Sequence, residues 1–288
     1  MFSEHEEAVL CRVITLAQQW SGCNFTRYNS STLRRRVERR MIDVRCQSVG
    51  DYLVFLENHP SEYRKLISAM TIKVSHFFRD PEVFTLIERL ILPKIMERTT
   101  TSRRAAVRIW SSACASGEEA YSLAILIAEL LDQQAAPHQE VTILATDLDC
   151  DSLAFAAEGI YHEESLRHVP ESIRNRYFRQ PDSLSCHYWQ VTPELRRMVS
   201  FVSFDLTNPS RLSPPSGIFS EYDFILCRNM LIYCQHSLKV DILRRFYLCL
   251  CADGYLALGR SESLPQSYQG HFCPVDSRLK IYLKKEML

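Results

Sequence analysis

The stretch "IWSSACASGEEAYSLAI", residues 109–125, decides the fold. An apolar run typical of a buried strand passes through a turn of small residues into a pattern typical of a helix. In open parallel sheets, ligands bind at such turns, beyond the carboxyl ends of the strands. Gly117 is the only glycine of this turn, whereas dinucleotide fingerprints use three glycines to receive a pyrophosphate. The stretch therefore predicts a strand–turn–helix ligand site that binds something other than a dinucleotide.

Two carboxylates at the start of the predicted helix, Glu118 and Glu119, indicate the charge of that ligand. They would repel a pyrophosphate and attract an amine or another positive centre. Asp147, in "ATDLD" at the end of the next predicted strand, stands where ribose recognition is expected. Together these residues favour S-adenosylmethionine over NAD or ATP. The alternative is that both glutamates only stabilise the positive end of the helix dipole.

From residue 107 onward, predicted strands alternate with predicted helices. The strands are apolar on both faces, which is typical of a mostly parallel sheet covered by helices on both sides. The predicted strands cover residues 107–113, 141–149, 200–206, 222–229, 254–261 and 279–285. The helical patterns between them cover residues 118–131, 151–160 and 237–251. The predicted fold class is therefore α/β.

Two other regions depart from this alternation. Residues 160–201 are polar, aromatic and irregular, which predicts an inserted subdomain of short strands or loops. Residues 1–98 instead show helical periodicity. The helical patterns there cover residues 6–20, 29–44, 51–60, 61–70 and 79–98. With polar "TTTSRR" (99–104) as the best candidate linker, we expect a helical domain over 1–98 and a larger domain over 99–288.

The chain carries 34 Lys and Arg against 34 Asp and Glu, so its formal net charge is zero. A neutral chain offers no global electrostatic field that would attract nucleic acid or an anionic membrane.

The start "MFSEHEEAVL" lacks the basic-then-apolar order of a signal peptide, and no apolar run reaches the roughly 18 residues of a membrane span. The eleven cysteines are scattered, without a CxxC pair. We therefore expect a cytoplasmic protein with reduced thiols, no metal site and no direct membrane insertion.

Five segments, in a fixed order, carry a resemblance to a known family. "WSSACASGEEAYSLA" is similar to W-S-x-x-C-S-T-G-E-E-P-Y-S-x-A, and "TIKVSHFFRD" to T-T-N-x-T-x-F-F-R-[DE]. "ATDLDCDSLAFAAEGIY" is similar to A-T-D-I-[DS]…A-x-x-G-x-Y, "YDFILCRNMLIYC" to F-D-x-I-x-C-R-N-V-L-I-Y-F, and "DGYLALGRSESL" to G-G-x-L-x-x-G-H-S-E-S-L. Because these segments span nearly the whole chain, the sequence resembles the chemotaxis receptor methyltransferases, the CheR family.

The resemblance implies a Rossmann-like S-adenosylmethionine-dependent methyltransferase fold with an N-terminal helical domain and a small inserted β-subdomain. It implies a protein-glutamate O-methyltransferase that uses S-adenosylmethionine to convert glutamates of chemoreceptor cytoplasmic domains to methyl esters, with S-adenosylhomocysteine as product. By resemblance, the cofactor contacts fall on Lys73, Ser75, Arg79, Glu119, Asp147, Asp205, Leu206, Asn229 and Met230.

Arg79 and Tyr233 match family positions close to the transfer site. A carboxylate that is ionised at neutral pH is already a nucleophile, so the reaction needs no general base. What remains for the protein is to align two reactants, which contributes several kcal/mol. Because tight pairing with Arg79 would quench the nucleophile, we favour Tyr233 as the residue that orients the acceptor.

Several positions depart from the family pattern, among them Ala120, which replaces the Pro after the glutamate pair. Lys73 stands where the family usually has Asn beside the cofactor, Asp205 replaces a common Asn, and Arg260 replaces a common His. A cation at Lys73 is unfavourable beside a sulfonium unless it points away or meets the methionine carboxylate. Lys73 therefore keeps an alternative open: a signalling scaffold or adaptor that binds S-adenosylmethionine and transfers no methyl group.

Six arginines lie between Arg34 and Arg45. The resemblance implies that this basic helix docks on the acidic helical bundle of a receptor, through Arg35, Arg36 and Arg39. Two alternatives are a solvated face with local ion pairs and a nucleic-acid surface. The zero net charge and the lack of interleaved aromatic residues disfavour nucleic acid.

Some members of the family bind a short tethering peptide, from a receptor's C-terminus, at the β-subdomain, through a loop that contains glycine. The corresponding segment here, "RQPDSLSCHYWQ" (179–190), has no glycine. Without the backbone freedom of glycine, we expect a differently shaped loop and no tethering by that C-terminal pentapeptide.

Overall fold

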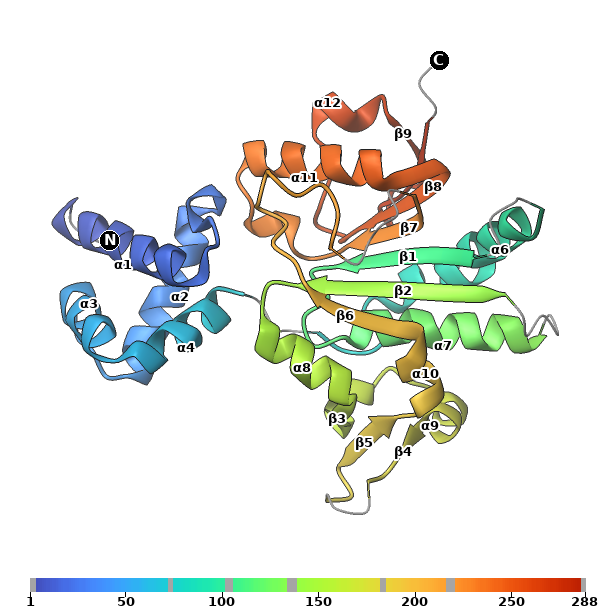
Figure 1. Ribbon diagram of the computed structural model, residues 1–288, viewed down its shortest axis with the longest axis horizontal. Helices are drawn as coiled ribbons and strands as arrows, with labels where there is room; N and C mark the ends of the chain where they lie inside the picture. Colours follow the sequence, from blue (N-terminus) through green and yellow to red (C-terminus); the bar gives the residue numbers. More distant parts are fainter. Residues whose placement is uncertain are drawn as a thin grey trace.

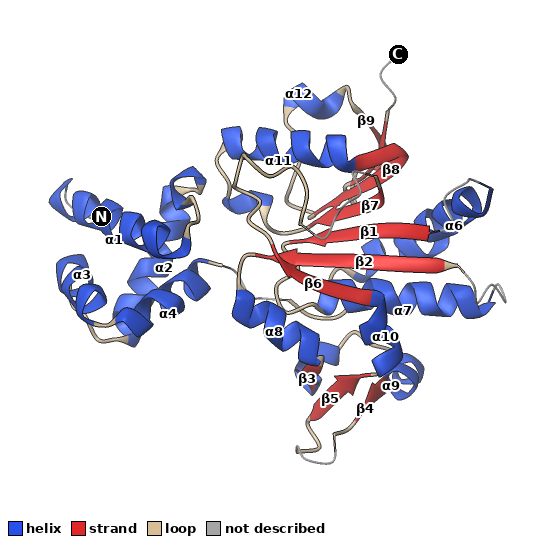
Figure 2. Ribbon diagram, viewed as in Figure 1, coloured by secondary structure: helices blue, strands red, loops and turns tan. Residues whose placement is uncertain are grey.

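The computed structural model describes residues 4–71, 75–101, 106–133, 139–181, 185–215 and 221–285. They form a group of helices, a larger α/β part and a small β-subdomain (Figures 1 and 2). In both views the helical group lies on the left and faces the carboxyl ends of the central strands. Lys73, one of the predicted cofactor residues, lies outside the described residues.

The N-terminal helices pack around a core of their own. Their bounds are α1 Glu4–Ser21, η1 Phe25–Arg27, α2 Ser30–Asp43, α3 Val49–Asn58 and α4 Pro60–Met70. Apolar positions at helical spacing face inward, and Val13, Val37 and Leu66 are fully buried there. α3 begins with a capping box, in which the side chains of Ser48 and Asp51 each accept the other's backbone N–H.

A seven-stranded sheet forms the centre of the larger part. Its strands are β1 Ala106–Ser112, β2 Glu140–Asp147, β6 Val199–Ser203, β7 Tyr222–Cys227, β8 Leu250–Leu258, β9 Phe272–Asp276 and β10 Ile281–Lys284. The order is β6-β2-β1-β7-β8-β10-β9, and β10 runs antiparallel to both of its neighbours. The chain continues from β1 to β2 on one side and later to β7 on the other. Such a reversal opens a crevice at the carboxyl ends of the strands beside β1.

Helices cover both faces of this sheet, as the alternation predicted. The larger helices are α7 Glu118–Gln133, α8 Cys150–Glu158 and α11 His236–Cys249, and the shorter ones are α10 Pro193–Met198, η4 Leu231–Tyr233 and α12 Gln266–Gln269. Successive side chains of β1 point to opposite faces. Ile109 joins the core that contains α7, whereas Trp110 joins the core that contains α11. The expected α/β fold, with a mostly parallel sheet covered by helices on both faces, is confirmed.

Residues 81–101 form one continuous helical stretch that packs on the sheet. It consists of α5 Pro81–Leu86, the π-helical segment η2 Ile87–Ile91 and α6 Leu92–Thr101. The π segment precedes Pro93, which has no N–H to donate and whose ring crowds the preceding turn of an α-helix. Val83 and Ile87 are fully buried in the core of the sheet. The apolar side of this helix therefore faces the α/β part.

The insertion after α8 forms a three-stranded antiparallel sheet with the order β3-β5-β4. Its elements are β3 Ile160–His162, η3 Glu163–Leu166, α9 Glu171–Tyr177, β4 Phe178–Arg179 and β5 Tyr188–Val191. This is the β-subdomain that the sequence predicted. It contacts the segment before α5, since Phe77 makes T-shaped ring contacts with Tyr161 and Phe178 and donates its N–H to the Ser165 carbonyl at 3.1 Å.

Candidate active site

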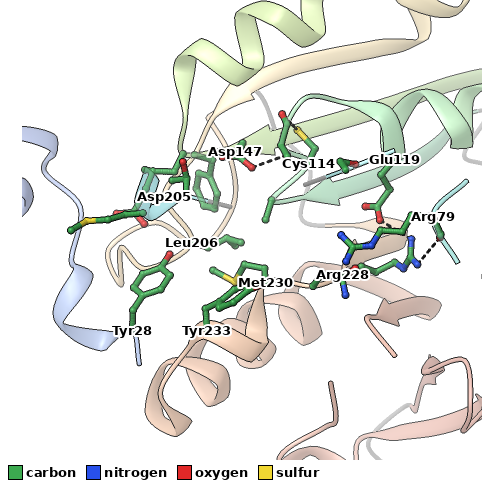
Figure 3. Close-up of a pocket in the computed structure, with 18 of the residues that line it drawn as sticks. Tyr28, Arg79, Cys114, Glu119, Asp147, Asp205, Leu206, Arg228, Met230 and Tyr233 are labelled. Carbon is green, nitrogen blue, oxygen red and sulfur yellow. Dashed lines mark hydrogen bonds and ion pairs between the residues drawn. The ribbon is translucent and has the colours of Figure 1, made fainter. Parts of the chain in front are cut away.

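A cavity of about 260 Å³ lies at the carboxyl ends of β1, β2, β6 and β7. The turn after β1 forms one side of it, and Figure 3 shows Asp147 and Asp205 beside that turn, with Arg79, Glu119 and Arg228 together at the other end. The cavity therefore occupies the place that the topology of the sheet predicts for a ligand.

The carboxylate of Asp147 fixes the backbone of the turn. Its oxygens accept the N–H groups of Ala115 at 2.8 Å and of Asp149 at 3.0 Å. Ala113 and Ala115 have φ values of 55° and 49°, a left-handed conformation that costs energy for residues other than glycine. Burial raises the pKa of Asp147, and its backbone hydrogen bonds oppose that rise. Each carboxylate oxygen can still accept a further donor.

The two glutamates at the start of α7 differ in their surroundings. Glu119 lines the cavity, where it accepts the Ser111 hydroxyl at 2.8 Å. Glu118 is buried on another side of the helix and accepts the Ser116 hydroxyl at 2.8 and 2.9 Å. Adjacent residues of a helix point about 100° apart, so the expectation that both carboxylates face the ligand holds for Glu119 alone.

Gly117 allows the start of α7 to pack closely against α8 and β6. Its φ is 90°, and a Cβ atom there would lie 2.8 Å from the Cβ of Ala156 and 3.0 Å from the ring of Phe201. The start of α7 thus lies directly against α8 and β6. The glycine of the opening stretch is needed for this close approach, which also sets the position of Glu119.

Arg228 is buried at the end of β7 and joins three parts of the site. Its guanidinium donates to Asp80 Oδ2 at 2.7 Å, to the Arg79 carbonyl at 2.9 Å and to Glu119 Oε2 at 3.2 Å. It also lies over the Phe84 ring, 5.4 Å from the ring centroid. Asp80 is held at a φ of 59°. Arg228 lies in the segment "YDFILCRNMLIYC", but its sequence context alone indicated no role for it.

The predicted cofactor and transfer residues that the structure describes come together around the cavity. They are Ser75, Arg79, Glu119, Asp147, Asp205, Leu206, Asn229, Met230 and Tyr233. Asp205 lies in a turn after β6, where its Oδ1 accepts both the N–H and the hydroxyl of Thr207 at 2.7 Å.

The N-terminal helices supply another part of the lining. Phe25, Tyr28, Met70 and Arg36 of α2 all face the cavity. Burial raises the pKa of Tyr28 well above its ordinary range, so its hydroxyl is neutral at physiological pH. One ligand site is therefore built from both the helical group and the α/β part.

The arginines of α2 divide into two groups. Arg40 forms a bidentate pair with the buried Glu62, with hydrogen bonds of 2.8 and 2.9 Å. Arg35 and Arg39 are exposed, and Arg39 lies 3.4 Å from Asp43. The interpretation of this helix as a set of local ion pairs thus applies to Arg34, Arg39 and Arg40, which contact Glu7, Asp43 and Glu62. The side chains of Arg35 and Arg39 nevertheless remain exposed.

Comparison with known proteins identifies the family. Residues 73–281 match the family model of the CheR methyltransferase SAM-binding domain, and residues 9–71 match that of the CheR methyltransferase all-alpha domain. This chain belongs to the CheR methyltransferase family. It is an S-adenosylmethionine-dependent methyltransferase of the chemotaxis type. The two matches meet between residues 71 and 73, where the two hydrophobic cores also separate.

Named relatives agree with this assignment. The chain is 30% identical to the chemotaxis protein methyltransferase of Escherichia coli over 254 residues, which cover 88% of this chain and 83% of that protein. It is 30% identical to chemotaxis protein methyltransferase 2 of Pseudomonas aeruginosa, with coverages of 84% and 82%. An uncharacterized 104.1 kDa protein of Rhodobacter capsulatus is 31% identical over 95% of this chain, which spans 27% of that longer protein.

The residues of this CheR cavity suit the family's cofactor. Glu119 and Asp147 offer carboxylate oxygens to an ammonium group and to hydroxyls. The side chains of Phe204, Leu206 and Met230 give apolar surface for an aromatic ring. Because S-adenosylmethionine carries all three kinds of group, its chemistry fits the described lining.

No described helix has the length and apolar character needed to cross a bilayer.

Glu262, a buried carboxylate that the sequence did not reveal, holds the segment after β7. Glu262 accepts the N–H groups of Gly259 at 2.5 Å, Asn229 at 3.1 Å and Ile232 at 3.2 Å. Asn229 has a φ of 62°. A Cβ atom at Gly259 would lie 2.7 Å from both the Asn229 nitrogen and Glu262 Oε2. The segment "GRSES" (259–263) therefore packs against the Asn229–Tyr233 segment and hydrogen-bonds to it.

Proposed function

We propose that this methyltransferase modifies glutamate side chains on the cytoplasmic helical bundle of a chemoreceptor, and so forms methyl esters. The observation that carries the proposal is that Arg36, from the basic helix α2, lines the same cavity as Glu119 and Tyr233. A receptor helix lying along α2 would bring its glutamates close to the donor site. The relatives named chemotaxis protein methyltransferase support this class of acceptor.

Asp147 and Glu119 are the proposed anchors of the donor. Asp147 would accept ribose hydroxyls with the lone pairs left beyond its backbone hydrogen bonds. Glu119 would accept the ammonium group of the methionine portion. Its contact with Arg228 keeps the carboxylate in place before the donor arrives. Ser75, Asp205, Leu206, Asn229 and Met230 would complete the donor contacts.

The donor supplies a methyl group on a sulfonium, so that a C–O bond forms as a C–S bond breaks and a neutral thioether leaves. The acceptor glutamate is ionised at neutral pH, and no proton has to be moved. The task of the chain is therefore alignment. We assign Tyr233 to orient the acceptor oxygen by donating a hydrogen bond. Arg79 would hold the donor's carboxylate, since pairing with the acceptor would reduce its nucleophilicity.

The test uses methyl-labelled S-adenosylmethionine and purified receptor cytoplasmic fragments. Label that appears on the fragment and is released by base is a methyl ester, and a fragment whose candidate glutamates are alanine should take up none. Tyr233→Phe should lower kcat about tenfold or more while the affinity for S-adenosylhomocysteine stays the same. Base-stable label would indicate a different acceptor chemistry and would contradict the proposal.

Two related expectations are tested alongside. A scaffold that transfers nothing would bind S-adenosylhomocysteine and leave the fragment unlabelled. The β-subdomain is proposed not to bind a receptor C-terminal pentapeptide; part of its loop, residues 182–184, lies outside the described residues. A pull-down with immobilised pentapeptide should retain no protein, and micromolar binding would overturn this part of the proposal.

A further inference from the structure

Residues 26–29, from the end of η1 to the start of α2, lie against residues 230–235, which include Tyr233. The N–H of Asn29 donates to the Tyr233 carbonyl at 2.8 Å, and its side-chain amide donates to the Ile232 carbonyl at 3.0 Å. Tyr28 and Cys234 form an antiparallel bridge. Two segments more than 200 residues apart in the sequence are thus hydrogen-bonded backbone to backbone at the edge of the cavity.

Gln235 makes the reciprocal contacts. Its N–H donates to the Arg27 carbonyl at 2.9 Å, and its side-chain amide donates to the carbonyls of Thr26 at 3.0 Å and Tyr28 at 3.1 Å. The ion pair between Arg27 and Asp241 lies beside them but is largely exposed, so it adds little.

Asn29 and Gln235 occupy equivalent places in their own elements. Asn29 is the N-cap of α2, and Gln235 is the N-cap of α11. An N-cap side chain normally accepts a backbone N–H of its own helix, and Asn is among the best residues for that role. Neither side chain makes a cap hydrogen bond here. Both amides are instead used to join the helical group to the α/β part.

We propose that Asn29 and Gln235 form an interdomain clamp that positions Tyr233. The backbone N–H of Asn29 bonds the carbonyl of Tyr233 itself, and η4, the short 3-10 helix that ends at Tyr233, is also held by Glu262, which accepts the N–H of Ile232. The clamp also fixes the start of α2, so that the basic helix and Tyr233 move as one unit. This role rests on the proposed function, in which α2 meets the acceptor and Tyr233 orients it.

The main test is Asn29→Asp. The carboxylate has the same size and can still accept N–H groups as an N-cap, but it cannot donate to the Ile232 carbonyl. Amide hydrogen exchange of residues 230–235 should become faster. Methyl transfer to receptor fragments should fall about tenfold in kcat, with the S-adenosylhomocysteine Kd unchanged, because Asn29 is not part of the cavity lining.

Gln235→Glu removes the opposite amide donor and should give the same two changes. Ser48→Ala is the matched control: it removes the capping box of α3 in the same helical group without touching the clamp. This control should leave both exchange at residues 230–235 and kcat at wild-type values.

The two readouts separate the inference from the proposed function. Faster exchange with no methyl transfer by the wild-type protein would reject the receptor acceptor and leave the clamp standing. Wild-type exchange in both Asn29→Asp and Gln235→Glu would overturn the clamp. Faster exchange with undiminished kcat would show that the clamp does not position Tyr233 for the reaction.

Discussion

The guanidinium of Arg228 lies 2.7 Å from the carboxylate of Asp80 and also contacts Glu119 at 3.2 Å. The arginine side chain is 2% exposed, whereas those of Asp80 and Glu119 are 25% and 14% exposed. One buried cation thus joins the segment that carries Arg79 to the first turn of α7. The relative position of two sides of the donor site depends on this contact.

Arg228→Met is expected to lower the free energy of unfolding by roughly 2–3 kcal/mol, because two carboxylates lose their partner while both stay partly buried. Urea unfolding monitored by circular dichroism measures this change. The matched control is Arg260→Met, which breaks an exposed contact with Glu82 at 3.8 Å. The control should change stability by less than about 0.5 kcal/mol. Equal effects of the two substitutions would contradict a buried role for Arg228.

Charge reversal on α2 should separate docking from donor binding. Arg35→Glu and Arg39→Glu are expected to reduce the rate of receptor methylation about tenfold at low ionic strength, because both side chains are exposed on the basic helix. The Kd for S-adenosylhomocysteine should be unchanged in both. Arg12→Glu, an exposed change on α1, controls for net charge. A loss of donor binding together with methylation would point to misfolding and would remove the support for docking.

Gly259→Ala should damage the Asn229–Tyr233 segment. The added methyl would lie 2.7 Å from the Asn229 nitrogen and from Glu262, so we expect a loss of about 1–3 kcal/mol in stability and weaker donor binding. Gly270→Ala is the control, since nothing lies within 4 Å of a Cβ there. Thermal unfolding and calorimetric titration with S-adenosylhomocysteine check both. If the two variants have the same stability and the same affinity for S-adenosylhomocysteine, the close approach at Gly259 does not determine either property.

Burial raises the pKa of Glu118 above its ordinary value of 4.5, although hydroxyl donors from Ser116 and Ser75 oppose the rise. The folded chain then binds this proton more tightly than the unfolded chain. The contribution of Glu118 to stability is therefore full below pH 4.5 and is lost as pH rises through the raised folded pKa. Glu118→Gln abolishes this titration.

The variant should accordingly gain stability relative to the wild-type protein as pH rises from 4.5 to neutral. Urea midpoints measured across that range test the sign, with the exposed Glu57→Gln as the control for loss of one charge. Stability curves of Glu118→Gln and wild type that stay parallel would disprove the assignment.

Much of the fold could be predicted because apolar residues recur at helix or strand spacing and because ligand-binding residues follow the ends of predicted strands. The strand before Gly117 and the helix after it follow from apolar patterning, and Asp147 follows from its place at the end of a strand. β9 was missed, since "FCPVD" contains Pro274 and an aspartate and reads poorly as a strand. It is tolerated at the edge of the sheet, where β10 is its partner.

The parts of the site that escaped prediction depend on contacts between distant residues. Arginine is rarely buried, so nothing local indicates that Arg228 turns inward to Asp80. The pairing of Asn29 with Ile232 is equally invisible, because Asn29 has the sequence of an ordinary N-cap. The different roles of Glu118 and Glu119 could have been anticipated from helix geometry, since neighbours on a helix face different directions.

Neither the helical group nor the α/β part forms the cavity alone. Tyr28 and Arg36 line it from the helical group, and Asp147 and Tyr233 line it from the α/β part. Cutting the chain near residue 72 would leave each fragment with an incomplete pocket, however well it folded. Chimeras that exchange the helical half between relatives would also have to carry the matching partner segment around Gln235.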